Sequence, residues 1–81
     1  MVAPKAVVTG GAGGLGQAFT RQLAAAGYEV VPVDVQGDVR RLDVTDPAAC
    51  RALAIELRPA IWVNNAGVTG AAGVVEADDA T

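Results

Sequence analysis

The sequence contains no histidine and only one cysteine, which limits both its redox chemistry and its metal chemistry. Cys50 has no second cysteine to pair with, so the chain forms no internal disulfide. Without histidine, no metal-binding cluster can be built around that thiol, and we expect no metal site. A chain without disulfides is typical of the cytoplasm, which is the compartment we predict.

Basic patches and long apolar runs are missing as well. Six lysines and arginines stand against nine acidic residues, which gives a net charge of −3. This balance predicts no nucleic-acid partner. The apolar run at residues 6–8 is too short for a signal peptide or a membrane span, so we expect no membrane partner. The hydrophobic content of 52% instead suits strands that are covered on both faces.

Apolar runs and helical patterns alternate along the chain. They predict strands at residues 5–9, 29–35, 39–44 and 60–64, and helices at residues 14–26 and 47–57. Gly27 is suited to end the first helix, and Asp46 followed by Pro47 is suited to begin the second. Pro32 is unusual for the interior of a central strand. From Ala66 onward, glycine, alanine and acidic residues predict a loop.

The order of these elements predicts a layered α/β fold. The first helix carries apolar residues at helical spacing on one face, namely Leu15, Ala18, Phe19, Leu23 and Ala26. Strand–helix–strand units imply right-handed crossovers and a parallel sheet. We therefore predict a Rossmann-type parallel sheet with flanking helices, incomplete and limited to about the first four strands. The first strand should lie at the centre, with the second and third strands on one side and the fourth on the other.

A glycine-rich run, Thr9-Gly10-Gly11-Ala12-Gly13-Gly14-Leu15-Gly16, joins the first strand to the first helix. Without β-carbons its backbone can approach an anion closely, and the N–H groups and dipole of the following helix favour negative charge. The run therefore predicts a phosphate cradle for a dinucleotide, at the switch point between the first and fourth strands. The glycines fit three spacing patterns at once, and a plain tight turn could be built from the same residues.

Asp34 lies near the end of the second predicted strand, 18 residues after Gly16, where a nucleotide-binding fold places a carboxylate. Its two oxygens can accept hydrogen bonds from both hydroxyls of the adenosine ribose. The same carboxylate would repel a 2′-phosphate, so we predict NAD as the cofactor, with NADP less favoured. The nearest cations, Arg40 and Arg41, are expected on the third strand. A solvated carboxylate at a strand end is the alternative interpretation.

Four separated elements resemble the short-chain dehydrogenase/reductase family. They are the glycine run, Asp34, Leu42-Asp43-Val44-Thr45-Asp46 and Asn64-Asn65-Ala66-Gly67. The last element resembles the classical branch, whereas the glycine run alone would also fit the extended branch of sugar-nucleotide epimerases and dehydratases. The connection from Asp34 to Asp43 is shorter than in the family, because it leaves no room for the helix that usually joins the second and third strands.

The resemblance implies a set of cofactor contacts. The pyrophosphate would be held by Gly10, Gly13, Gly14, Leu15 and Gly16, with the Leu15 amide among the contacts. Asp43 would contact the adenine amino group beside the Val44 backbone. Asn65, Ala66 and Gly67 would line the ribose side, and Asn65 would also brace the glycine loop near Thr9.

The family's proton-transfer residues are absent from this sequence. Members use a downstream serine, a Tyr-x-x-x-Lys pair and an asparagine, but this chain has no serine, its only tyrosine is Tyr28 and its only lysine is Lys5. No lysine follows Tyr28 at the required spacing. We therefore predict no catalytic residue in these 81 residues, which alone should be inactive.

The resemblance implies that residues 1–81 form the N-terminal NAD(P)-binding Rossmann portion of an oxidoreductase whose catalytic half lies outside the chain. That enzyme would transfer a hydride between the nicotinamide and an alcohol or ketone substrate. As is common in the family, it would form a homo-oligomer. The alternatives are a non-catalytic dinucleotide-binding module and a fragment of an extended-type sugar-nucleotide epimerase or dehydratase.

Overall fold

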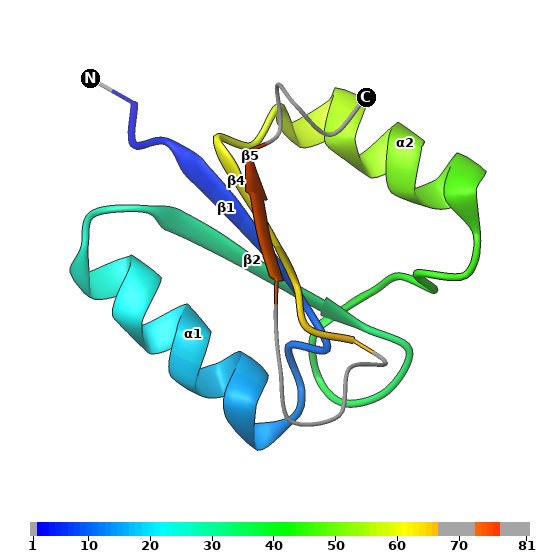
Figure 1. Cartoon of the computed structure of the whole chain (residues 1–81), viewed down its shortest axis with the longest axis horizontal. Coiled ribbons are helices and arrows are strands. Elements are labelled where there is room, and N and C mark those ends of the chain that lie inside the picture. The colour runs from blue at the N-terminus through cyan, green and yellow to red at the C-terminus, as the bar shows by residue number, and fades with distance from the viewer. Residues whose placement is uncertain (1, 67–72, 77–81) are drawn as a thin grey trace.

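The computed structural model describes residues 2–66 and 73–76 of the chain. In chain order its elements are β1 (Lys5–Thr9), α1 (Gly14–Ala25), β2 (Glu29–Asp34), β3 (Arg40–Arg41), α2 (Pro47–Leu57), β4 (Ile61–Asn64) and β5 (Gly73–Glu76). The strands form one sheet in the order β3-β2-β1-β4-β5. Figure 1 shows α1 and α2 on opposite faces of that sheet.

The first four strands are parallel and β1 lies at their centre, so the predicted Rossmann-like α/β fold and strand order are confirmed. The registers place Val7 of β1 opposite Val31 of β2 and Trp62 of β4. Parallel strands with helices between them bring their carboxyl ends to one edge. The glycine loop after β1 and Asp34 at the end of β2 therefore lie at the same edge of the sheet.

The predicted loop from Ala66 onward is wrong for residues 73–76, which form β5. This strand pairs antiparallel with β4, so that Trp62 lies opposite Val75 and Asn64 opposite Gly73. Four residues between stretches rich in glycine and alanine carry too weak a pattern to predict a strand. The pairing depends instead on the free backbone groups along the outer edge of β4, which belong to a distant part of the chain.

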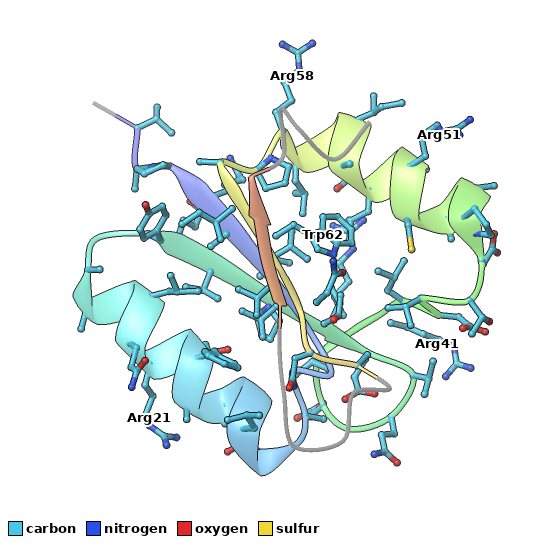
Figure 2. The ribbon with its side chains drawn as sticks, viewed as in Figure 1. Arg21, Arg41, Arg51, Arg58 and Trp62 are labelled. Carbon is cyan, nitrogen blue, oxygen red and sulfur yellow. The ribbon has the colours of Figure 1, made fainter. Side chains whose placement is uncertain are left out.

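The hydrophobic core lies mainly between the sheet and α2. Its buried cluster consists of Val7, Val33, Leu42 and Leu53. Cys50 and Trp62 are partly buried against this cluster, and Figure 2 shows Trp62 between the sheet and α2. β1 contributes the most buried segment, because its side chains at residues 6–9 are at most 1% exposed. This burial on both faces is what the predicted central position of β1 requires.

On the other face, α1 packs less completely than its pattern predicts. Ala18, Phe19 and Leu23 are half-buried, as expected for the face that covers the sheet. Leu15 is 49% exposed and Ala26 is also exposed, so the two ends of this face are not covered by the sheet. Leu15 lies in the first turn, beside the cavity described below, and Ala26 follows the last turn.

Local sequence signals set the ends of both helices as predicted. Gly27 adopts a φ of +100° directly after α1, and its N–H donates to the Ala24 carbonyl at 3.1 Å. Asp46 precedes α2, and its carboxylate accepts a hydrogen bond from the Ala49 N–H at 3.1 Å. Pro47 occupies the first turn, where its missing N–H leaves no bond unmade.

Removal of the Asp46 cap should lower the free energy of unfolding by about 1 kcal/mol in Asp46→Ala, because the first-turn N–H groups lose an acceptor. Urea denaturation measures this change. Asp46→Asn is the matched control, since asparagine caps as well as aspartate and should leave the stability nearly unchanged. Equal stability of the alanine variant and the wild type would contradict a capping role.

The predicted third strand at residues 39–44 is mostly wrong, because β3 comprises only Arg40–Arg41. The Leu42 N–H still donates to the Asp34 carbonyl at 3.0 Å. The chain then turns, since the N–H and the hydroxyl of Thr45 both donate to Asp43 Oδ1, at 2.9 and 2.6 Å. Aspartate favours such local turns over an extended strand.

Pro32 is tolerated within β2 because its backbone nitrogen, which has no hydrogen to donate, faces the side on which β3 is short. N–H and C=O groups of successive residues in a strand point to alternate sides. The Val33 carbonyl accepts from the Gly11 N–H at 2.9 Å, on the β1 side, whereas Asp34 faces β3. Pro32 therefore also faces the β3 side, where β3 begins only opposite Val33. No ladder hydrogen bond is lost.

Candidate functional site

A cavity of about 630 Å³ opens at the carboxyl edge of the sheet, between the glycine loop, the end of β2, the turn after β3 and the end of β4. Nine of the predicted site residues line it: Gly10, Gly13, Gly14, Leu15, Asp34, Asp43, Val44, Asn65 and Ala66. Gly16 is buried behind it, and Gly67 lies outside the described residues. Four further residues that the sequence did not predict as contacts line the cavity, namely Val35, Gln36, Leu42 and Thr45, which flank the two predicted aspartates.

Three glycines of the loop are required by packing within the protein. Gly10 has a φ of +66°, which side-chain-bearing residues rarely adopt. A β-carbon on Gly11 would lie 2.5 Å from the Pro32 Cβ, and one on Gly16 would collide with the Gly10 carbonyl oxygen. These glycines let the loop pass close to β2 and to the start of α1.

Gly13 and Gly14 are different, because nothing in the described part of the chain requires them to be glycine. Gly13 has a φ of −78° and Gly14 is helical. A β-carbon on Gly13 would lie no closer than 3.5 Å to the Gly10 carbonyl oxygen, and one on Gly14 would meet nothing within 4 Å. Both are exposed and line the cavity. Their lack of side chains therefore leaves space on the cavity side of the loop.

The start of α1 presents unused backbone donors to that space. Gly13 is the N-cap residue, no side chain caps the helix, and the first turn contains no acidic residue. The first N–H groups of a helix have no partner within the helix, and the helix dipole adds positive potential there. The open space at the glycine loop and the N-terminus of α1 together fit a diphosphate group.

Thr9 connects the ends of β1 and β4. Its hydroxyl is buried, donates to the Val63 carbonyl at 3.1 Å, and accepts from the N–H groups of Asn65 and Ala66 at 2.8 and 3.0 Å. The Asn65 side chain donates to the Gly10 carbonyl at 3.4 Å. The prediction that Asn65 braces the glycine loop near Thr9 is thus confirmed. The role of Thr9 itself was missed, because a threonine at the end of a strand has no distinctive sequence pattern.

Asp34 is half-buried and uses both carboxylate oxygens. Oδ2 accepts from the Ala12 N–H at 3.1 Å, and Oδ1 accepts from the Val35 N–H at 2.7 Å. A carboxylate offers about four acceptor positions. Asp34 can therefore accept ligand hydroxyl donors while it remains attached to the glycine loop.

Asp43 lies across the cavity from the glycine loop, in the turn after β3. Hydrogen bonds from the Thr45 hydroxyl and N–H favour its charged form and hold the pKa of Asp43 below its ordinary value. Both bonds go to Oδ1, so Oδ2 keeps its acceptor positions.

Arg40 and Arg41 lie on β3, as predicted. Arg40 makes a bidentate ion pair with Glu56 of α2, and Arg41 Nη1 donates to the Val35 carbonyl at 2.8 Å. Figure 2 shows Arg41 at the periphery of the molecule. Neither arginine lines the cavity, whose described lining carries the carboxylates of Asp34 and Asp43 but no cation. Among residues 2–66 and 73–76, no group of histidine, cysteine or acidic side chains could hold a metal ion.

A parallel sheet with a glycine-rich turn and acidic strand ends at its carboxyl edge defines a Rossmann-like nucleotide-binding protein. Residues 6–81 match the sequence model of the NAD dependent epimerase/dehydratase family, and the chain belongs to that family.

Comparison with curated proteins also finds a relative from Streptomyces avermitilis, 1-deoxy-11-beta-hydroxypentalenate dehydrogenase. The two sequences are 38% identical over an alignment that is 91 residues long and that covers 85% of this chain and 34% of the relative. The chain thus spans about a third of the length of that relative. No solved structure matches the chain.

The family confirms the resemblance to short-chain dehydrogenase/reductase proteins and implies a nicotinamide dinucleotide cofactor. The open space at Gly13 and Gly14 and the uncapped helix fit such a group. No helix in the described part of the chain has the length and apolar character to cross a bilayer.

Proposed function

We propose that this chain is the NAD-binding portion of an oxidoreductase of the short-chain dehydrogenase/reductase type. The observation that carries the proposal is the pair Gly13 and Gly14, which leave space beside an uncapped helix that no group of the described chain fills. The diphosphate would lie there, against the N–H groups of the first turn, including that of Leu15. Packing accounts for the other glycines of the loop.

The remaining contacts would follow the cavity wall. Asp34 would accept hydrogen bonds from the hydroxyls of the adenosine ribose, and Asp43 would accept one from the adenine amino group beside Val44. On the opposite side, Asn65, Ala66 and Gly67 would approach the ribose. These residues bind and orient the cofactor, and the bound nicotinamide supplies the hydride acceptor or donor.

The charges of the cavity favour NAD over NADP. A 2′-phosphate on the adenosine ribose would approach the Asp34 carboxylate, and no cation of the described lining would compensate the repulsion. The guanidinium groups of Arg40 and Arg41 are engaged with Glu56 and the Val35 carbonyl.

The side chains that transfer a proton to or from the substrate would have to lie outside these 81 residues. Tyr28 precedes β2, and Lys5 begins β1 with its ammonium 3.8 Å from a carboxylate oxygen of Glu29. Both lie at the amino edge of the parallel strands, opposite the cavity. The 81 residues alone should therefore bind the cofactor without turning over an alcohol or ketone. A homo-oligomeric, cytoplasmic enzyme remains our expectation for a complete protein.

A parent enzyme of the epimerase or dehydratase type is the second candidate, and the name of the matching family favours it. The Asn64-Asn65-Ala66-Gly67 element and the dehydrogenase relative support the classical branch instead. Assays of a complete protein separate the two. Net reduction of NAD by a secondary alcohol indicates a dehydrogenase, whereas conversion of a nucleotide sugar without net change in NAD indicates an epimerase or dehydratase.

Asp34→Ala tests the adenosine side of the site. We expect the Kd for NAD to rise about tenfold to a hundredfold, because charge-assisted hydrogen bonds to the ribose are lost. The Kd for NADP should rise less or fall, because the repulsion of its 2′-phosphate is removed as well. Titration calorimetry measures both values. Asp38→Ala is the matched control, since Asp38 is an exposed carboxylate of the same connection that does not line the cavity. Unchanged NAD affinity in Asp34→Ala would refute the ribose contact.

A further inference from the structure

Ala12, at the tip of the glycine loop, is held from three directions. Its N–H donates to Asp34 Oδ2 at 3.1 Å, and its carbonyl accepts from the Gln17 side-chain amide at 2.9 Å. Its methyl group packs against Gly37, where an added β-carbon would lie 2.5 Å from the Ala12 Cβ. The three contacts come from β2, from α1 and from the connection between β2 and β3.

Two of these three contacts lie outside the cavity. Gln17 and Gly37 line a second hollow of about 410 Å³, together with Ala12, on the other side of the glycine loop. Neither of them lines the cavity that contains Gly13, Gly14 and Asp34. A ligand in the cavity would therefore touch neither residue directly. Gln17 can act on it through the glycine loop, and Gly37 can act through the loop or through its neighbour Gln36, which lines the cavity.

The Gly37 contact depends on the short connection between β2 and β3. Residues 35–39 contain no helix, and Gly37 has a φ of +81°, which turns the chain beside the glycine loop. The connection, which is shorter than in the family pattern, thus passes against the back of the loop at Gly37.

We propose that Gln17 and Gly37 are positioning residues that fix Ala12, and with it the glycine loop, in the conformation that receives the cofactor diphosphate. The inference rests on the proposed function of the cavity. A loop with five glycines loses much conformational entropy when it is ordered, so contacts that order it in advance raise the affinity for its ligand. We call the three contacts to Ala12, from Asp34, Gln17 and Gly37, the Ala12 clamp.

Gly37→Ala tests the clamp, because the new β-carbon meets the Ala12 Cβ. We expect the Kd for NAD to rise about tenfold as the loop is displaced. Ala12→Gly in the same chain should restore affinity to that of Ala12→Gly alone, since the next atom of Ala12 lies 3.8 Å from the new β-carbon. Gly27→Ala is the matched control, because Gly27 also has a positive φ but a β-carbon there would meet nothing within 4 Å. It should lose stability and keep its affinity.

Gln17→Ala tests the clamp at an exposed residue. This variant still tests the proposal if Gly37→Ala does not fold. We expect the Kd for NAD to rise about threefold on loss of one hydrogen bond. Gln22→Ala, at another exposed glutamine of α1, should bind NAD as the wild type does. Calorimetric titrations and thermal melts of the purified variants provide the comparison.

Amide hydrogen exchange of the ligand-free chain tests the clamp independently of the cofactor. The Ala12 N–H should exchange about tenfold faster in Gly37→Ala, and the backbone N–H at this position should recover its protection when Ala12→Gly is added. A wild type that fails to bind NAD refutes the proposed function, and this exchange measurement then still decides the clamp. Wild-type affinity and exchange in both Gln17→Ala and Gly37→Ala, or a Gly37→Ala defect that Ala12→Gly does not restore, would overturn the clamp.

Discussion

Gly14→Val should raise the Kd for NAD about a hundredfold and change the free energy of unfolding by less than about 1 kcal/mol. The structure has room for the new side chain, because a β-carbon on Gly14 meets nothing within 4 Å. Valine is also no worse than glycine in a helix. The side chain would, however, occupy the space beside the helix N-terminus in which the diphosphate is proposed to lie. Titration calorimetry and urea denaturation measure the two effects separately.

Gly16→Ala provides the opposite pattern from a glycine two residues away. Its β-carbon would collide with the Gly10 carbonyl oxygen, so the variant should lose stability whether or not a cofactor is present. Gly14→Val and Gly16→Ala thus separate a glycine that a ligand needs from one that packing needs. Normal NAD affinity in a folded Gly14→Val variant would show that the diphosphate does not lie at this loop.

Thr9→Val should lower the free energy of unfolding by about 3 kcal/mol, because it leaves three buried or half-buried backbone groups without their hydroxyl partner. Valine has nearly the shape of threonine, but it cannot accept from the N–H groups of Asn65 and Ala66 or donate to the Val63 carbonyl. Trp62, the only tryptophan, is partly buried against the core, so its fluorescence should report the urea transition.

Thr9→Ser is the control for this prediction. Serine keeps the hydroxyl and removes only a buried methyl group, which should lower the stability by about 1 kcal/mol. Similar losses in Thr9→Val and Thr9→Ser would mean that the methyl group, and not the hydrogen bonds, stabilises the junction of β1 and β4.

The features that the sequence predicts well are those with local causes. Gly27 ends α1 because its own backbone can adopt a positive φ, and Asp46 begins α2 because its side chain reaches an N–H three residues ahead. The strand order is that of a Rossmann-type fold, in which the first strand is central and the order reverses beside it. The cavity residues could be predicted from the sequence because parallel strands bring their carboxyl ends together at one edge of the sheet.

The features that escape prediction depend on contacts between distant segments. β5 forms because β4 offers it an edge, and β3 is cut short because the Asp43 side chain competes for the backbone of Thr45. The different roles of the glycines were equally hidden, because the sequence fits three spacing patterns. Only the positions of Pro32 and of the Gly10 carbonyl show which glycines are required by packing.

Because β5 is paired with β4, any further strand that joins the sheet beside β4 must compete with β5 for the same edge. A strand can have only one neighbour on each side, and the outer side of β4 is paired with Gly73–Glu76. An incoming parallel strand would need the same donors and acceptors. Insertion of such a strand next to β4 therefore requires strand exchange, in which the β5 segment is released while the incoming strand forms its hydrogen bonds with β4.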